Sequence, residues 1–176
     1  MSRHGPGTRE LDVQVTAAAR VAPRVARDLK RHLASAQRML RSPLQEMSIA
    51  LVGDARMSQL HEQFMGVAGP TDVLTFELDH DARGRVTSGE VVVCVPQARR
   101  EARKRGIDLQ LELLLYALHG MLHLCGFDDR TERGFRTMHR REDDILTRLG
   151  FGPVFALSSP TPVRRGGRQR RRERGT

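Results

Sequence analysis

A chain of 176 residues with an apolar share of 39% is long enough to bury one substantial core, and its formal charge of +9 favours negatively charged partners. It has no uncharged apolar stretch of the ~20 residues that a membrane span needs and no apolar signal core near its N-terminus, so we expect a cytoplasmic protein. Its two cysteines, Cys94 and Cys125, lie far apart in apolar runs, which indicates buried thiols in a reducing compartment and excludes a disulfide framework.

Strands and helices are predicted to alternate along the chain. Apolar runs bounded by turn residues predict four strands, at residues 11–15, 46–52, 73–78 and 89–95. Amphipathic or apolar stretches with proline or glycine near their ends predict five helices, at residues 23–40, 54–64, 96–105, 109–125 and 131–149. This mixture predicts a single α/β (α+β) domain, in which helices flank a mixed sheet of about four strands and the apolar helix at 109–125 packs centrally against it.

Polar residues within these elements have both structural and functional interpretations. Asp54 is placed to cap the second helix. Thr71 and Asp72 stand at the entrance of the third strand, where they either satisfy loop amides or take part in function. The basic face of the first helix we interpret as solvated, whereas the third helix, with five basic residues between Arg99 and Arg105, is open to both a solvated and a phosphate-binding interpretation.

The helix at 109–125 carries one polar stripe. At 100° per residue, Glu112, Tyr116, His119 and His123 fall within about 60° of one another, while almost every other position is apolar. Buried polar groups need partners, and two histidines at i and i+4 are spaced to bind one metal ion. The stripe therefore predicts a metal site.

A third ligand is expected just after this helix. Gly126 provides a helix stop, and the following turn can bring Asp129 back over the histidines, which gives three ligands and one open position, as in catalytic metal sites. Asp128 is an alternative ligand, in which case Asp129 caps the next helix. His139 is a further imidazole, and Cys94 is a less favoured fourth ligand.

The end of the chain differs in composition from the rest. Residues 158–176 hold seven arginines and a single acidic residue, Glu173, and so contribute +6 of the formal +9 charge. They offer no core, so we expect a disordered tail that binds nucleic acid through phosphates. Residues 1–9 are expected to be a flexible lead-in, which leaves residues 10–157 as the folded domain.

Two motifs resemble those of one known family. Residues 119–129, HGMLHLCGFDD, resemble the HGxLHLxGYDH signature of the YbeY family, the metal-dependent endoribonucleases of bacterial ribosomal RNA maturation. Residues 70–76, PTDVLTF, resemble that family's PTDVLSFPF strand, and the likeness extends over about residues 10–152. It implies 16S 3′-end processing and ribosome quality control, with ribosomal RNA and small-subunit components as partners. It also implies a zinc ion held by three histidines, two of which are His119 and His123.

Two positions depart from the family pattern. Asp129 stands where the third histidine is expected, which keeps a ligand type but makes the site more anionic and weakens its Lewis acidity. Met65 stands where a functional arginine is expected, in a segment that otherwise resembles LNxxYR, and methionine cannot bind phosphate. The resemblance therefore predicts the fold more firmly than the catalytic residues.

These residues leave three functions open. The resemblance implies a metal-dependent endoribonuclease, in which the metal activates a water or the ribose 2′-hydroxyl and polarises a phosphate oxygen. Met65 favours a non-catalytic ribosome-assembly factor whose metal only stabilises the fold. A non-haem iron oxygenase would use two histidines and a carboxylate, but the chain lacks the long β-rich scaffold usual for that chemistry.

One further chemistry is excluded by a single residue. An HExxH peptidase has its general base directly after the first histidine, where this chain has Gly120, a residue that we expect to leave room for a bulky substrate. Glu112 lies about 10 Å along the helix from His119, too far to share its metal but placed to orient a group or handle a proton.

Overall fold

Four strands form one mixed sheet in the order β1-β2-β4-β3. The computed structural model describes residues 11–155. The strands are β1 (Asp12–Ala17), β2 (Glu46–Val52), β3 (Val73–His80) and β4 (Val86–Cys94). β1, β2 and β4 run parallel, whereas β3 is antiparallel to β4. The predicted mixed four-stranded sheet is therefore confirmed.

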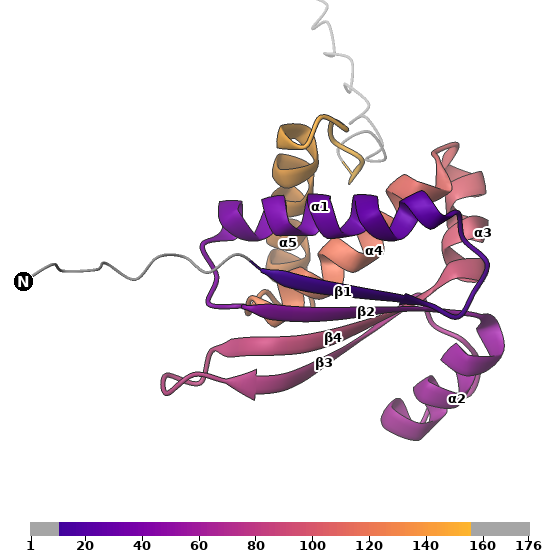
Figure 1. The fold of residues 1–176 in the computed structure, drawn as a ribbon, viewed down its shortest axis with the longest axis horizontal. Helices are drawn as coiled ribbons and strands as arrows, with labels where there is room; N and C mark the ends of the chain where they lie inside the picture. The colour runs from indigo at the N-terminus through magenta and orange to yellow at the C-terminus, as the bar shows by residue number, and fades with distance from the viewer. Residues whose placement is uncertain (1–10, 156–176) are drawn as a thin grey trace, which may run out of the picture.

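Helices cover the two faces of this sheet unequally (Figure 1). They are α1 (Pro23–Leu40), α2 (Asp54–Met65), α3 (Val95–Arg105), α4 (Leu109–Leu124) and α5 (Glu132–Arg148). α1 and α4 pack on one face, where Met47, Ile49 and Leu51 of β2 belong to the main core. α2 packs against the other face, where Val52, Leu74 and Val92 form a second, smaller cluster. α4 contacts α1, α3, α5, β3 and β4, which confirms its predicted central position.

The predicted boundaries are close to the observed ones, with two instructive differences. β3 and β4 are longer than predicted because the connecting hairpin is tight: Asp81 Oδ1 accepts hydrogen bonds from the amides of Arg83 and Arg85. The predicted capping role of Asp54 is wrong. The helix begins after Gly53 without a side-chain cap, and Asp54 instead accepts two hydrogen bonds from Arg100, at 2.8 and 3.0 Å.

Glycines allow α4 to lie unusually close to β4. A Cβ added to Gly120 would lie 2.6 and 2.7 Å from the two methyl carbons of Val91, and one added to Gly89 would lie 2.5 Å from Leu124 Cδ2. These separations are far inside normal carbon contacts. Gly120 thus faces the sheet, and the expectation that it leaves room for substrate beside the metal is wrong.

Several sequence predictions concern the limits of the domain. Within residues 11–155, none of the helices has both the length and the apolar character needed to cross a membrane. Cys94 and Cys125 are both free thiols, as expected, but only Cys94 is buried, and Cys125 is half-buried. Near the end of the described residues, Val154 is buried in the main core and Phe155 packs against it. The predicted lead-in at 1–9 and the arginine-rich tail at 158–176 lie outside the described residues.

Candidate metal centre

The C-terminal half of α4 and the turn that follows it bring the three predicted ligands together. His119 and His123 occupy successive turns of α4, and Asp129 returns over them. In the described part of the chain, these three residues are the one group of at least three possible ligands, with one donor atom from each lying within 4.8 Å of the others. Their side chains are 21%, 31% and 32% exposed, so the cluster is partly accessible to solvent.

Each imidazole is held through its Nδ1 atom. His119 Nδ1 lies 2.8 Å from Glu142 Oε1, and His123 Nδ1 lies 3.1 Å from the carbonyl oxygen of Phe127. A carboxylate and a carbonyl only accept hydrogen bonds, so each ring keeps its proton on Nδ1 and presents the lone pair of Nε2. Hydrogen bonds of this kind orient the histidines of metal sites and increase their basicity.

The distances between the free donor atoms fit a small metal ion. The two Nε2 atoms are 3.1 Å apart, and Asp129 oxygens lie 3.5 Å from His119 Nε2 and 3.8 Å from His123 Nε2. Ligands in a tetrahedral zinc site, with bonds of about 2.0–2.1 Å, are roughly 3.3–3.4 Å apart. Two lone pairs facing each other at this distance need a cation or a proton between them. The donor set therefore fits a metal with a fourth position open.

The turn that carries Asp129 is fixed by its backbone. Gly126 adopts φ +88°, and the Phe127 amide donates to the Leu122 carbonyl, which folds the chain back onto α4. Thr131 then caps α5 by accepting a hydrogen bond from the Gly134 amide at 3.0 Å. A Cβ on Gly134 would lie only 2.1 Å from the Asp128 carbonyl oxygen, so this close packing requires glycine.

The alternative ligands have other partners. Asp128 pairs with Arg130, whose hydrogen bonds lower the pKa of that carboxyl to about 2, and it lies outside the cluster. Asp129 does not cap α5, since Thr131 does. His139 Nδ1 bonds to Glu142 Oε2. Cys94 is buried on β4 beside Asp54, and burial raises the pKa of its thiol to about 11.

Glu142 is the functional candidate that sequence reasoning missed. Glu142 is fully buried in α5, and its two carboxylate oxygens bond to His119 and His139. Burial opposes a charge on His119, but the hydrogen bond and the charge of Glu142, together with Asp129, outweigh it and raise the pKa of His119. One signal was present: Glu142 shares the apolar face of α5 with Met138, Ile145 and Leu146, where a carboxylate needs a buried partner.

The N-terminal part of the polar stripe, Glu112 and Tyr116, is separate from the donor cluster. Glu112 is fully buried, neither of its oxygens meets a hydrogen-bond donor in bonding geometry, and Arg105 Nη1 lies 3.7 Å from Oε2. Burial raises the pKa of Glu112, and it also raises the pKa of the neighbouring Tyr116 hydroxyl. Among the described residues, Glu112 therefore forms an ion pair with Arg105 and does not belong to the donor cluster.

Three other residues named in the sequence predictions lie near the cluster or on the surface. Asp72 Oδ1 accepts a hydrogen bond from the Val73 amide, as the structural interpretation predicts, whereas the Thr71 hydroxyl donates to Asp72 rather than pairing with a loop amide. The Asp72 carboxylate also acts electrostatically on His119, so it lies close enough to contribute to the field of the site. Met65 is the last residue of α2 and is 63% exposed.

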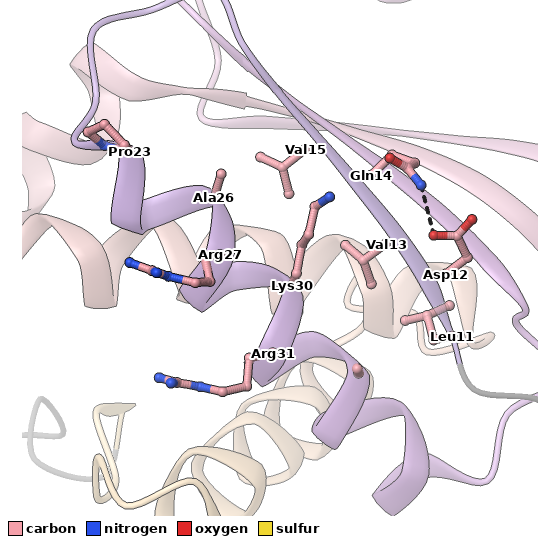
Figure 2. A pocket seen from close by; sticks show the side chains of 11 residues that line it. Leu11, Asp12, Val13, Gln14, Val15, Pro23, Ala26, Arg27, Lys30 and Arg31 are labelled. Carbon is pink, nitrogen blue, oxygen red and sulfur yellow. Dashed lines mark hydrogen bonds between the residues drawn. The ribbon is translucent and has the colours of Figure 1, made fainter.

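The sequence predicts basic surfaces on α3 and α1. On α3, Arg100 pairs with Asp54, Lys104 with Glu101 and Arg105 with Glu112, which leaves Arg99 and Arg103 without a described ion pair. On α1, a cleft of about 680 Å³ opens against β1. Figure 2 shows Arg27 and Arg31 pointing away from β1 and Lys30 extending toward it. This cleft shares no residue with the candidate metal centre.

Comparison with known proteins matches this chain to a family model, to curated proteins and to a solved structure. A family model described as Endoribonuclease YbeY matches residues 8–150. Endoribonuclease YbeY of Acidothermus cellulolyticus is 38% identical over 131 residues, which are 68% of this chain and 79% of that protein. The protein of the same name from Thermobifida fusca is 38% identical over 130 residues, 70% of this chain and 82% of that one. A solution structure of a Thermotoga maritima protein matches with a TM-score of 0.55 and 24% identity, over 87% of this chain and 99% of that one, which shows a shared fold.

Proposed function

The chain belongs to the YbeY family, and from this we propose that it is a metal-dependent endoribonuclease that acts in ribosomal RNA maturation. The observation that carries the proposal is the donor cluster of His119, His123 and Asp129, partly accessible to solvent and oriented from behind by Glu142 and the Phe127 carbonyl. Its substrate would be ribosomal RNA, its partners would be components of the small ribosomal subunit, and its location would be the cytoplasm.

We propose zinc as the ion, bound by Nε2 of each histidine and by a carboxylate oxygen of Asp129. Nitrogen and carboxylate donors at these separations support it. A zinc ion at this position would lower the pKa of a bound water and polarise a phosphate oxygen. The chain itself holds both imidazoles in the metal-binding tautomer through Glu142 and Phe127 O, and leaves the accessible part of the cluster to the substrate.

Positive charge outside the cluster would bind the RNA backbone. The tail at 158–176 has seven arginines, and removing it is expected to weaken RNA binding and to reduce the dependence of affinity on salt concentration. Equal salt dependence with and without the tail would refute its role in phosphate contact.

Met65 supports a second candidate function. The family arginine is replaced by an exposed, uncharged side chain, so a non-catalytic assembly factor with a metal-stabilised fold is the alternative. The two functions differ in whether RNA cleavage depends on the donor cluster.

Metal analysis and a cleavage assay together test the proposal. After adventitious metal is removed, elemental analysis should give about one zinc per chain, and less in Asp129→Ala. Purified protein should cleave a ribosomal RNA fragment, and His123→Ala should abolish cleavage. His80→Ala is the matched control, because His80 is an exposed histidine on the β3–β4 hairpin whose side chain, within residues 11–155, pairs with Glu77 alone. Zinc binding without cleavage, or cleavage that persists in His123→Ala, would favour the assembly factor or a contaminating nuclease.

A further inference from the structure

Residues 151–155, the last that the structure describes, are connected to the candidate metal centre by a continuous series of contacts. His119 bonds to Glu142 Oε1, and Glu142 Oε2 bonds to His139 Nδ1 at 2.5 Å. The ring of His139 stacks on Phe155, with centroids 3.8 Å apart and planes 26° apart. From these contacts we propose that His139 and Phe155 are positioning residues for the metal centre, which act by holding the Glu142 carboxylate on His119.

A buried carboxylate requires a partner for each oxygen. The Glu142 side chain is only 1% exposed, and removing a charge from water is costly unless hydrogen bonds replace the hydration. Since His119 is bonded to one oxygen, His139 provides the partner for the other and so fixes the rotation of the carboxylate. Without that N–H, Glu142 would turn or share its oxygens differently, and the hydrogen bond that orients His119 would weaken.

Two aromatic rings contact the imidazole of His139. Phe155 stacks on it, and Phe135 lies edge-on, with centroids 4.0 Å apart and planes at 90°. Such contacts fix the plane of the imidazole, which determines where its N–H points. Neither Phe155 nor His139 would touch the metal, so their effect would pass entirely through Glu142.

Phe155 is anchored by groups from two helices. Asp143 Oδ1 of α5 accepts hydrogen bonds from the amides of Val154 and Phe155, at 2.7 and 3.0 Å. The guanidinium carbon of Arg105, at the end of α3, lies 5.6 Å from the centre of the Phe155 ring, within cation–π range. The segment 151–155 is thus attached at a defined position. Phe151, at the other end of this segment, instead contacts His32 of α1, with ring centroids 5.1 Å apart.

The difference between these two phenylalanines provides the test. Phe155→Ala removes the stack on His139, whereas the matched control Phe151→Ala removes a ring of the same size from the same segment without contact to His139. His139→Phe keeps a ring against Phe155 but has no N–H for Glu142, and His139→Gln restores a donor. Zinc affinity would be measured by competition with a chromophoric chelator, alongside the thermal unfolding of each metal-free variant.

The inference rests on the proposed metal site, and the measurements separate the two. We expect Phe155→Ala and His139→Phe to bind zinc about tenfold more weakly, since a changed partner behind a metal-bound histidine costs 10–100-fold in affinity. Phe151→Ala should change affinity less than twofold, and His139→Gln should recover part of the loss of His139→Phe. The Co²⁺-substituted protein should show a shifted visible absorption band in the two weakened variants.

Three results would overturn the proposal. His139→Phe could bind zinc as tightly as the wild type, Phe151→Ala could lose as much affinity as Phe155→Ala, or His139→Gln could recover nothing. A variant with reduced thermal stability is judged by its Co²⁺ spectrum at a temperature where it is folded, and an unchanged band would count against the proposal. A wild-type chain that binds no zinc would instead refute the metal site itself.

Discussion

Because α4 lies close to the sheet, we expect Gly120→Ala to destabilise the protein, although helix propensity alone would predict that it stabilises. Alanine in place of glycine inside a helix normally stabilises by about 1 kcal/mol. Here the new methyl carbon would lie 2.6 and 2.7 Å from the Val91 methyls and 3.1 Å from Thr75 Oγ1, against a usual carbon separation of roughly 3.5–4.0 Å.

The size of the effect follows from how little the neighbours can move. Val91 is fully buried on β4, between β2 and β3, and its branched side chain has few alternative rotamers. Overpacking of such a site costs up to about 3 kcal/mol, so the net loss after the gain in propensity is about 2 kcal/mol. For a domain of this length, that corresponds to a fall in Tm of about 4–8 °C.

Urea unfolding of the metal-free protein would measure this, because bound metal would add its own stabilisation. The midpoint should fall with an unchanged slope. In a Val91→Ala background the clash is absent, so Gly120→Ala should become neutral or stabilising, with a coupling energy of about 2 kcal/mol or more. A stabilised single variant, or a coupling energy near zero, would refute the assignment of Gly120 to the sheet contact.

Three further predictions concern the centre and the buried acid. Asp129→His should retain about one zinc per chain while Asp129→Ala loses it, and equal losses in elemental analysis would show that position 129 does not face the histidines. Gly134→Ala should lower zinc affinity about tenfold in a chelator competition, because its methyl group would displace the Asp128 carbonyl and the neighbouring ligand; unchanged affinity would contradict the described turn. The raised pKa of buried Glu112 means that the folded state holds this proton more tightly than the unfolded state, so stability should fall as the pH rises from about 4.5 through the folded-state pKa. Glu112→Gln should flatten that fall and stabilise the protein at neutral pH by about 1–3 kcal/mol in urea unfolding, and a destabilised variant would show that the Arg105 pair outweighs the burial cost.

The parts of the centre that were predictable from the sequence are those set by local geometry. His119 and His123 are one helical turn apart, and the glycine turn returns Asp129 within six residues of His123, so spacing alone indicates that they meet. The same holds for the predicted helices and strands, whose periodicity and flanking prolines and glycines are local signals.

The parts that escaped prediction depend on contacts between distant residues. Glu142 is 23 residues from His119, and its charged neighbours made α5 look like an ordinary surface-packed helix. Asp54 has the position of a helix cap, but an arginine 46 residues away is its partner. The side of α4 that Gly120 occupies was equally hidden, because the polar stripe fixes where the histidines point but not how near the adjoining face of the helix comes to β4.

The order of these residues along the chain also has a consequence for protein synthesis. All three ligands lie within residues 119–129, whereas Glu142 and Phe155, which hold His119 from behind, come later. Since translation proceeds from the N-terminus, a nascent chain presents the complete ligand set before it has the groups that orient it. We therefore expect prematurely terminated chains ending before residue 142 to bind metal weakly, so that the centre matures only when nearly the whole domain has been made.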